Sequence, residues 1–291
     1  MNIDSKYAEY VSYFETTLNE CLQSLDETAP RVIKEAMKYA VADGGKRVRP
    51  VLCYAASESL GLKKEAVKEL ALAVELIHSY SLVHDDLPAM DNDDYRRGKF
   101  STHKKFGEAF GILAGDALLN YAYEICLKAE NFDEAHARAL YAIAKCAGYS
   151  GMIAGQVLDL DGEKLDTADE KTLYAVYENK TSKLLTAPLL AASELCGGAY
   201  RKEFEEYGKN LGITFQITDD FMDADGSFDQ IGKTPNKDEK ENKLTSIKVF
   251  GREGAKARAR THYELAKKAI DSVPDSEFLS AFLDKLYKRT F

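Results

Sequence analysis

Residues 66–84 read AVKELALAVELIHSYSLVH. Apolar side chains recur so densely here that a helix formed by this stretch is apolar on most of its sides, through Val67, Leu70, Leu72, Val74, Leu76, Ile77 and Val83. Such a helix belongs at the centre of a bundle. Residues 203–223, EFEEYGKNLGITFQITDDFMD, have the same design and carry no charge from Leu211 to Thr218. We expect both helices to lie in the core.

The rest of the chain fits the same architecture. It has 291 residues, 45% of them hydrophobic, and six prolines separated by long stretches of Ala, Leu, Glu and Lys at helical spacing. Strand signals are weak, and neither a repeat nor a Pro/Gly/Ser-rich linker divides the sequence. We therefore predict one all-α domain over residues 1–291, a single large helical bundle, with loops at 43–45 and 225–243.

Composition excludes several classes of protein. The net charge of −9 argues against a nucleic-acid binder. No apolar run approaches the roughly 18 residues of a membrane span, and no secretory signal is visible. Five widely separated cysteines without C-x-x-C spacing predict neither a zinc site nor disulfides, but small buried side chains in a reducing, cytoplasmic setting.

Two acidic clusters follow directly on the two apolar helices. They have the patterns D-D-x-x-x-x-D and D-D-x-x-D and consist of Asp85, Asp86 and Asp91, and of Asp219, Asp220 and Asp223. In the second, residues four apart share one helix face. In the first, Pro88 intervenes, so the helix must end or bulge before Asp91 can point the same way.

We expect a cation to be bound between these carboxylates. A lone acid run is usually solvated surface, but here the acids emerge from the core side, where unpaired like charges destabilise the fold. Oxygen ligands without thiolate suit Mg²⁺, which takes one or two carboxylates and completes its shell with water and phosphate. A metal held in this way implies a phosphorylated ligand.

Basic residues supply candidate phosphate contacts. A flexible Gly-Gly turn leads into cationic side chains in GGKRVRP (44–50), and RRG (96–98) adds two arginines whose planar groups suit diphosphate. A third group consists of Lys180, Thr181, Lys233, Lys237 and Lys243. Each group alone is typical of solvated surface. Together with two acidic clusters they predict a site for two phosphorylated substrates.

Seven motifs, in order and at the expected spacing between about residue 36 and about residue 250, resemble the trans-prenyl diphosphate synthases, most closely the bacterial-type farnesyl diphosphate synthases. They are GGKRVRP, HSYSLVHDDLPAMDNDDYRRG, STHKKFGEAFGILAGDALL, AGQVLDLDG, NKTSKLL, FQITDDFMD and IGKTPNKD. The resemblance implies an all-α fold of the isoprenoid synthase type around a deep central cavity, usually as a homodimer. It also implies Mg²⁺-dependent head-to-tail condensation of isopentenyl diphosphate with an allylic diphosphate.

The resemblance further assigns roles to individual residues. Asp85, Asp86 and Asp91 would hold two Mg²⁺ ions, and Asp219 with Asp220 and Asp223 a third. Isopentenyl diphosphate would be bound by Lys46, Arg49, His78 and Arg97. The allylic diphosphate would be bound by Arg96, Lys180 and Lys233, while Thr181 and Gln216 would place oxygens near the developing carbocation. Lys243, in the same loop as Lys233, is a further candidate for substrate binding.

Tyr80 and Ser81 are the candidates for product length. Tyr80 lies five residues before Asp85, about 7.5 Å along the helix axis, where its ring can close the cavity floor, whereas Ser81 is too small. The expected product is farnesyl diphosphate, with a geranylgeranyl diphosphate synthase as the alternative. Asn236 and the pair Thr245-Ser246 depart from the family pattern, which puts closure of the flexible loop in question.

Rival interpretations remain at this stage. The His84-Asp85 dipeptide is compatible with a metal-dependent phosphohydrolase, although the second acidic cluster would then have no role. A terpene cyclase would not need both the GGKRVRP and RRG groups, and a non-catalytic partner subunit would be expected to lack metal aspartates. His78, two helical turns before Asp85, fits either a core histidine or a site residue.

Overall fold

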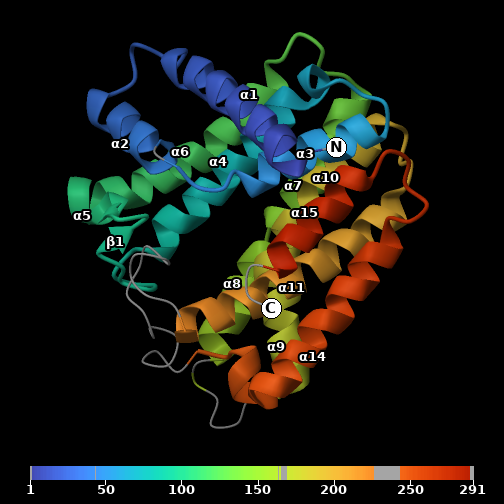
Figure 1. The fold of residues 1–291 in the computed structure, drawn as a ribbon. Coiled ribbons are helices and arrows are strands. Elements are labelled where there is room, and N and C mark those ends of the chain that lie inside the picture. Colours follow the sequence, from blue (N-terminus) through green and yellow to red (C-terminus); the bar gives the residue numbers. More distant parts are fainter. Residues whose placement is uncertain (1, 43, 163, 165–168, 226–242, 289–291) are drawn as a thin grey trace.

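The computed structural model describes residues 2–42, 44–162, 164, 169–225 and 243–288, and nearly all regular structure in these ranges is helical (Figure 1). The first half contains α1 (Ile3–Gln23), α2 (Arg31–Val41), α3 (Val48–Ser59), the short η1 (Lys64–Val67), α4 (Lys68–Asp85), α5 (Thr102–Phe106) and α6 (Glu108–Leu127). The second half contains α7 (Glu134–Ala147), α8 (Met152–Gly162), α9 (Glu170–Val176), the π-helical η2 (Tyr177–Ser182), α10 (Lys183–Leu195), α11 (Arg201–Asp225), α14 (Ser246–Ala269) and α15 (Glu277–Tyr287).

The helix predicted from residues 66–84 is confirmed as a central element. Most side chains of α4 are buried, and α4 packs most extensively against α6 and also against α3, α10 and α1. In Figure 1 it runs through the interior of the upper half of the molecule. The helix ends at Asp85, which is partly exposed, and the next residue, Asp86, is still buried. The first two aspartates of the cluster therefore lie at the edge of the core.

The second predicted core helix is also confirmed. It forms part of α11, which runs beside α14 and packs against α10 and η2 (Figure 1). One cluster of buried side chains extends from Tyr10 to Leu286, and a smaller one from Leu173 to Ala259 lies around α11 and α14. The two aspartate-bearing helices therefore belong to the hydrophobic core of the molecule.

The described strands are limited to one hairpin. β1 (Tyr95–Arg96) and β2 (Lys99–Phe100) pair antiparallel, with Tyr95 opposite Phe100. The residues between them, Arg97 and Gly98, both have positive φ angles, 53° and 76°. This conformation is typical of tight two-residue hairpin turns. The hairpin thus fixes the two adjacent arginines of RRG.

All five cysteines are free thiols, of which Cys53, Cys126 and Cys146 are buried and the other two partly so. Within the described residues, no helix has the length and apolar character needed to cross a bilayer. Most of the loop predicted at 225–243 lies outside the described residues.

Candidate active site

The first aspartate cluster forms where α4 ends. The helix stops at Asp85, and the chain then folds back so that the Asp91 amide donates to the Asp85 carbonyl at 2.8 Å. Pro88 lies inside this reversal. The expectation that the helix ends before Asp91 is therefore confirmed.

Asp85 lies in surroundings that disfavour its own charge. Burial raises its pKa to about 6, with further contributions from Asp91 and Asp86, although Lys180 and Arg96 oppose the shift. The Gln156 amide on α8 donates to its carboxylate. A cation placed here would favour the ionised form, so the position suits a metal ligand.

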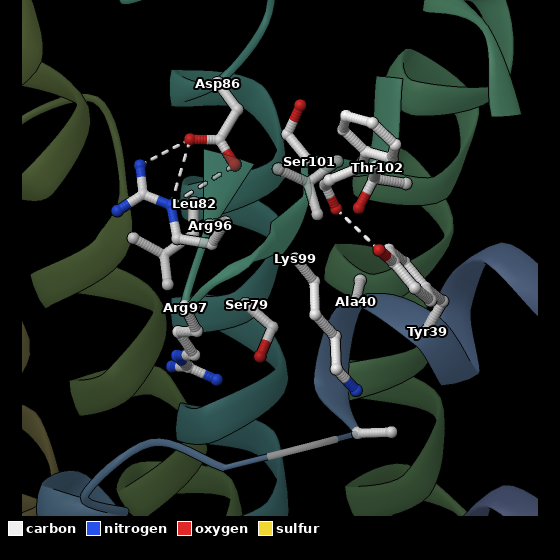
Figure 2. Close-up of a pocket in the computed structure, with 13 residues that line it drawn as sticks. Tyr39, Ala40, Ser79, Leu82, Asp86, Arg96, Arg97, Lys99, Ser101 and Thr102 are labelled. Atoms are coloured by element: carbon white, nitrogen blue, oxygen red, sulfur yellow. Dashed lines mark hydrogen bonds and ion pairs between the residues drawn. The ribbon is translucent and has the colours of Figure 1, made fainter. Parts of the chain in front are cut away.

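Asp86 is almost fully buried, at 2% exposure, and pairs with Arg96 from β1. The Arg96 Nε donates to Oδ1 at 3.0 Å, and Nη2 donates to the same carboxylate (Figure 2). Burial still raises the pKa of Asp86 despite this partner. Both residues line a pocket of about 40 Å³ together with Arg97 and Ser79, which has room for only a few water molecules. Figure 2 shows the Arg97 guanidinium on the other side of this pocket from Asp86.

In the second cluster, Asp220 on α11 accepts hydrogen bonds from groups on two other elements. Its Oδ2 accepts from the Ser246 amide at 2.7 Å, from the Ser246 hydroxyl at 2.6 Å and from the Tyr177 hydroxyl. Ser246 begins α14 and Tyr177 begins η2. Asp223 is also buried, whereas Asp219 is partly exposed. Asp220 therefore joins α11, η2 and α14 in addition to any role at a metal.

The π-helical segment η2 presents Lys180 and Thr181. Lys180 Nζ lies 2.5 Å from Asp159 Oδ2 on α8. Burial lowers the pKa of Lys180, but the charges of Asp159 and Asp85 outweigh this effect and raise it overall. Thr181 Oγ1 donates to Gln216 Oε1 on α11 at 2.8 Å. The predicted pair Thr181 and Gln216 is thus brought together, and Lys180 lies within electrostatic reach of Asp85.

Three of the residues predicted to bind isopentenyl diphosphate form a basic group below the first cluster. Arg49 Nε is buried without a hydrogen-bond partner among the described residues. Burial lowers the pKa of Arg49 to about 10, with Glu75 opposing and Arg97 assisting the shift. Burial and the arginines Arg49, Arg97, Arg96 and Arg47 together hold the pKa of His78 well below its usual value. A neutral imidazole among guanidinium groups is a favourable place for an anion.

The fourth predicted residue, Lys46, is exposed in the turn before α3. Arg97 Nη1 donates to the Gly44 carbonyl in this turn at 2.6 Å. Gly45 has a φ of 104°, and a Cβ on it would lie 2.7 Å from the Arg97 guanidinium. Glycine at this position therefore allows the close approach of Arg97.

The residues predicted to set product length lie one to two turns before Asp85. Tyr80 is buried, and its ring meets the His84 ring edge-on at a centroid distance of 5.7 Å. Ser81 is buried, and its hydroxyl donates to the His78 carbonyl at 2.8 Å. His84 Nε2 lies 3.0 Å from the Ile112 carbonyl on α6, against Gly115. His84 thus has structural partners, which disfavours the phosphohydrolase interpretation of the His84-Asp85 dipeptide.

Of the predicted loop residues, Lys233, Asn236 and Lys237 lie outside the described part of the chain. Lys243 Nζ lies 3.4 Å from Asp91 Oδ1, which places it at the first acidic cluster. Thr245 caps α14 by accepting from the Lys248 amide at 3.3 Å. At the two positions that depart from the family pattern, Thr245 therefore caps the start of α14 and Ser246 donates to Asp220.

Several residues at the site were not among those predicted. Gln156 and Asp159 contact Asp85 and Lys180, and their Q-x-x-D spacing within AGQVLDLDG puts them on one face of α8. That spacing was a usable signal. Tyr177 and Ser246 carry no such signal, because their contact with Asp220 depends on how three distant segments pack.

The residues fit Mg²⁺. Both clusters offer only carboxylate oxygens, and the raised pKa of Asp85 indicates that a positive charge would be stabilising there. In the described ranges, no three carboxylate, imidazole or thiol groups form a complete metal site by themselves. Mg²⁺ takes few protein ligands and obtains the others from water and phosphate.

Comparison with known proteins identifies the family. The family model described as "Polyprenyl synthetase" matches residues 30–277. The chain is 38% identical to a farnesyl diphosphate synthase of Geobacillus stearothermophilus over 277 residues, which cover 93% of this chain and 92% of that protein. It is 42% identical over 243 residues to geranylgeranyl pyrophosphate synthase 4 of Arabidopsis thaliana, covering 80% and 65% of the two chains.

A solved structure agrees over nearly the whole length. A geranyltransferase of Helicobacter pylori, described as complexed with magnesium and isoprenyl diphosphate, has a TM-score of 0.86 and 29% sequence identity, with 99% of this chain and 98% of that chain covered. The fold is therefore that of the all-α isoprenoid synthases. With the family model matching most of its length, this chain belongs to the polyprenyl synthetase family.

Proposed function

We propose that the protein is a magnesium-dependent prenyltransferase that condenses isopentenyl diphosphate with dimethylallyl and geranyl diphosphates to give farnesyl diphosphate. The main support is that two separate groups of cationic side chains lie along α4, as expected for two anion sites. Lys180 and Arg96 lie near Asp85 at its end, while Arg49 and Arg97 lie around neutral His78 two turns earlier. Two diphosphates placed side by side along one helix are what a condensation requires.

The carboxylates are assigned to three Mg²⁺ ions. Asp85, Asp86 and Asp91 would hold two ions, and Asp219, Asp220 and Asp223 would hold the third. When bound, the metal neutralises charge on the leaving diphosphate so that the allylic C–O bond can ionise. Asp220 would contribute chiefly by fixing the end of α11, since its Oδ2 already accepts from Ser246 and Tyr177.

Cationic side chains would bind and orient the two substrates. Arg96, Lys180, Lys233 and Lys243 are assigned to the allylic diphosphate, and Lys46, Arg49, His78 and Arg97 to isopentenyl diphosphate. Thr181 donates its hydroxyl proton to Gln216, so its lone pairs are available to the developing allylic cation. The proton released after the alkene attacks would pass to the diphosphate product.

Product length is assigned to Tyr80. A buried ring one turn and a half before Asp85 would stop a growing chain at three isoprene units, with Ser81 leaving space beside it. The match to the Arabidopsis geranylgeranyl pyrophosphate synthase supports geranylgeranyl diphosphate as the alternative product. A deep central cavity below Asp85 remains a prediction.

One experiment tests the activity and its product. The protein is incubated with Mg²⁺, isopentenyl diphosphate and either dimethylallyl or geranyl diphosphate, and products are read by mass spectrometry. Farnesyl diphosphate from both starters is the expected result. Accumulation of geranylgeranyl diphosphate would select the alternative, and the absence of any condensation would refute the proposed function.

We also propose that the chain is one domain and assembles as a homodimer. The main core cluster contains residues from both ends of the chain, which supports a single domain. Near the start of α6, Phe110, Ile112 and Leu113 are 38%, 47% and 52% exposed, and neighbouring exposed apolar residues commonly mark an interface. Light scattering should give twice the 32.4 kDa chain mass, and a monomer at micromolar concentration would contradict the assembly.

A further inference from the structure

Arg47 is among the largest fully buried side chains of the described molecule, at 1% exposure. Its Nε donates to Glu15 at 2.7 Å, Nη1 to Glu75 at 3.1 Å and Nη2 to the Val41 carbonyl at 2.8 Å. The guanidinium also lies 5.4 Å from the centre of the Phe14 ring. Every nitrogen of Arg47 is therefore engaged with α1, α4 or the end of α2, and the side chain is not placed to hold a substrate.

The backbone of Arg47 adopts a conformation that needs support. Its φ is 46°, in the left-handed region that a non-glycine residue rarely occupies. Such residues persist only where the surrounding structure holds them. Arg47 also accepts from the Val51 amide at 3.1 Å, at the first turn of α3. The buried guanidinium therefore fixes both the turn and the starting point of α3.

The residues on either side of Arg47 are assigned to substrate. Lys46 is exposed, and its carbonyl accepts from the Tyr7 hydroxyl on α1. Arg49, in the first turn of α3, has a buried Nε without a hydrogen-bond partner in the described structure. Because the Arg47 side chain points into the core, Lys46 faces outward. The same anchor fixes the direction in which Arg49 leaves the axis of α3.

We propose that Arg47, clamped by Glu15 and Glu75, is a positioning residue that sets Lys46 and Arg49 for isopentenyl diphosphate. This inference rests on the proposed function and adds three residues to it that do not touch substrate. Glu75 is central, because this buried residue of α4, at 2% exposure, lies between the Arg47 clamp and the Arg49 and Arg97 charges that it partly offsets. Loosening the clamp should weaken one substrate site and spare the other.

The cleanest variant is Glu15→Gln. Arg47→Ala would leave the Glu75 carboxylate buried and unpaired and endanger folding, whereas Glu15 is partly exposed, so its loss is tolerable. We expect the KM for isopentenyl diphosphate to rise about tenfold, with kcat and the KM for geranyl diphosphate within about twofold of the parent. Arg47→Lys should act in the same direction, because lysine keeps the charge but cannot reach three partners.

Glu9→Gln is the matched control. Glu9 lies on the same helix and pairs with Lys64 at 2.7 Å, and it makes no described contact with the turn. This variant should leave both KM values unchanged. An equal rise in the two KM values, or the same rise in Glu9→Gln, would show that Arg47 contributes only general stability.

Amide hydrogen exchange supplies a readout that needs no activity. Residues 44–49 should exchange faster in Glu15→Gln than in the parent or in Glu9→Gln. Unchanged exchange would overturn the clamp whatever the kinetics show. If the parent protein condenses no substrates, the proposed function fails, while the exchange result still decides whether Arg47 holds the turn.

Discussion

At the scale of single residues, Asp85 shows the conflict between stability and function. Its folded pKa of about 6 lies above the ordinary value of about 4. The folded metal-free protein therefore favours the protonated carboxyl. The resulting contribution of Asp85 to folding stability is fully present below about pH 4 and is lost as the pH rises to about 6. At pH 7 the ionised carboxylate therefore destabilises the fold.

Replacing Asp85 by Asn should increase the stability of the protein and decrease its activity. Without metal, Asp85→Asn should raise the free energy of unfolding at pH 7 by about 1–3 kcal/mol, because a shift of one pKa unit corresponds to about 1.4 kcal/mol. Turnover should fall by about a thousandfold, since charge stabilisation in the transition state is lost. Urea unfolding and steady-state rates measure the two effects. A loss of stability, or near-normal turnover, would contradict the assignment.

Tyr80 allows a second prediction for a single residue. Tyr80→Ala removes a buried ring near the end of α4 and should shift the product toward geranylgeranyl diphosphate. The condensation rate should stay within about tenfold, because no assigned diphosphate or metal contact is lost. Mass spectrometry of the products measures the shift. Tyr80→Phe keeps the ring and is the control, and an unchanged farnesyl product in Tyr80→Ala would place the floor elsewhere.

At the scale of elements, the π-helical segment η2 depends on two glycines. A Cβ on Gly155 of α8 would lie 2.1 Å from the Lys180 amide nitrogen, and one on Gly212 of α11 would lie 2.3 Å from the Ser182 hydroxyl. π-Helical turns are frequent at functional sites. Here the close approach from both sides holds the segment that presents Lys180 and Thr181.

Gly155→Ala should therefore displace η2. We expect kcat to fall at least about tenfold and stability to fall by about 1–3 kcal/mol, as for other overpacked cores. Gly162→Ala, on the same helix, is the control, because a Cβ there would lie at an ordinary 3.8 Å from Leu244. Kinetics and thermal melting of both variants provide the comparison. Equal effects in the two variants would argue against a specific role for the contact with η2.

The predictability of this fold and site from sequence also differs by element. The helices around residues 66–84 and 203–223 were predictable because burial on most sides leaves a dense apolar pattern, and the end of α4 followed from Pro88. The π-helical conformation of η2 was not predictable, because it depends on α8 and α11 packing against it through single glycines. The Asp220 contact with Tyr177 and Ser246 joins residues 43 and 26 positions apart, and no local pattern records it.

At the scale of the whole molecule, the two acidic clusters end two core helices that belong to different parts of the bundle. Asp86 pairs with Arg96, and Asp91 lies near Lys243. These cations already offset part of the negative charge. A diphosphate would draw such cations to itself and leave the carboxylates to Mg²⁺, so metal and diphosphate should bind cooperatively.

This coupling predicts a specific pattern of thermal stability. Mg²⁺ alone or inorganic diphosphate alone should raise the melting temperature only slightly, whereas both together should raise it by several degrees. Ligands at a hundredfold excess over their dissociation constant contribute about 2.7 kcal/mol, and each kcal/mol corresponds to roughly 2–4 °C in a chain of this size. Thermal melting with each addition, and again after EDTA, measures the effect. Asp85→Asn combined with Asp219→Asn should abolish the joint shift while leaving helical content unchanged. If Mg²⁺ alone produced the full shift, the protein would hold a complete metal site of its own, and the proposed sharing of ligands between carboxylates and diphosphate would be wrong.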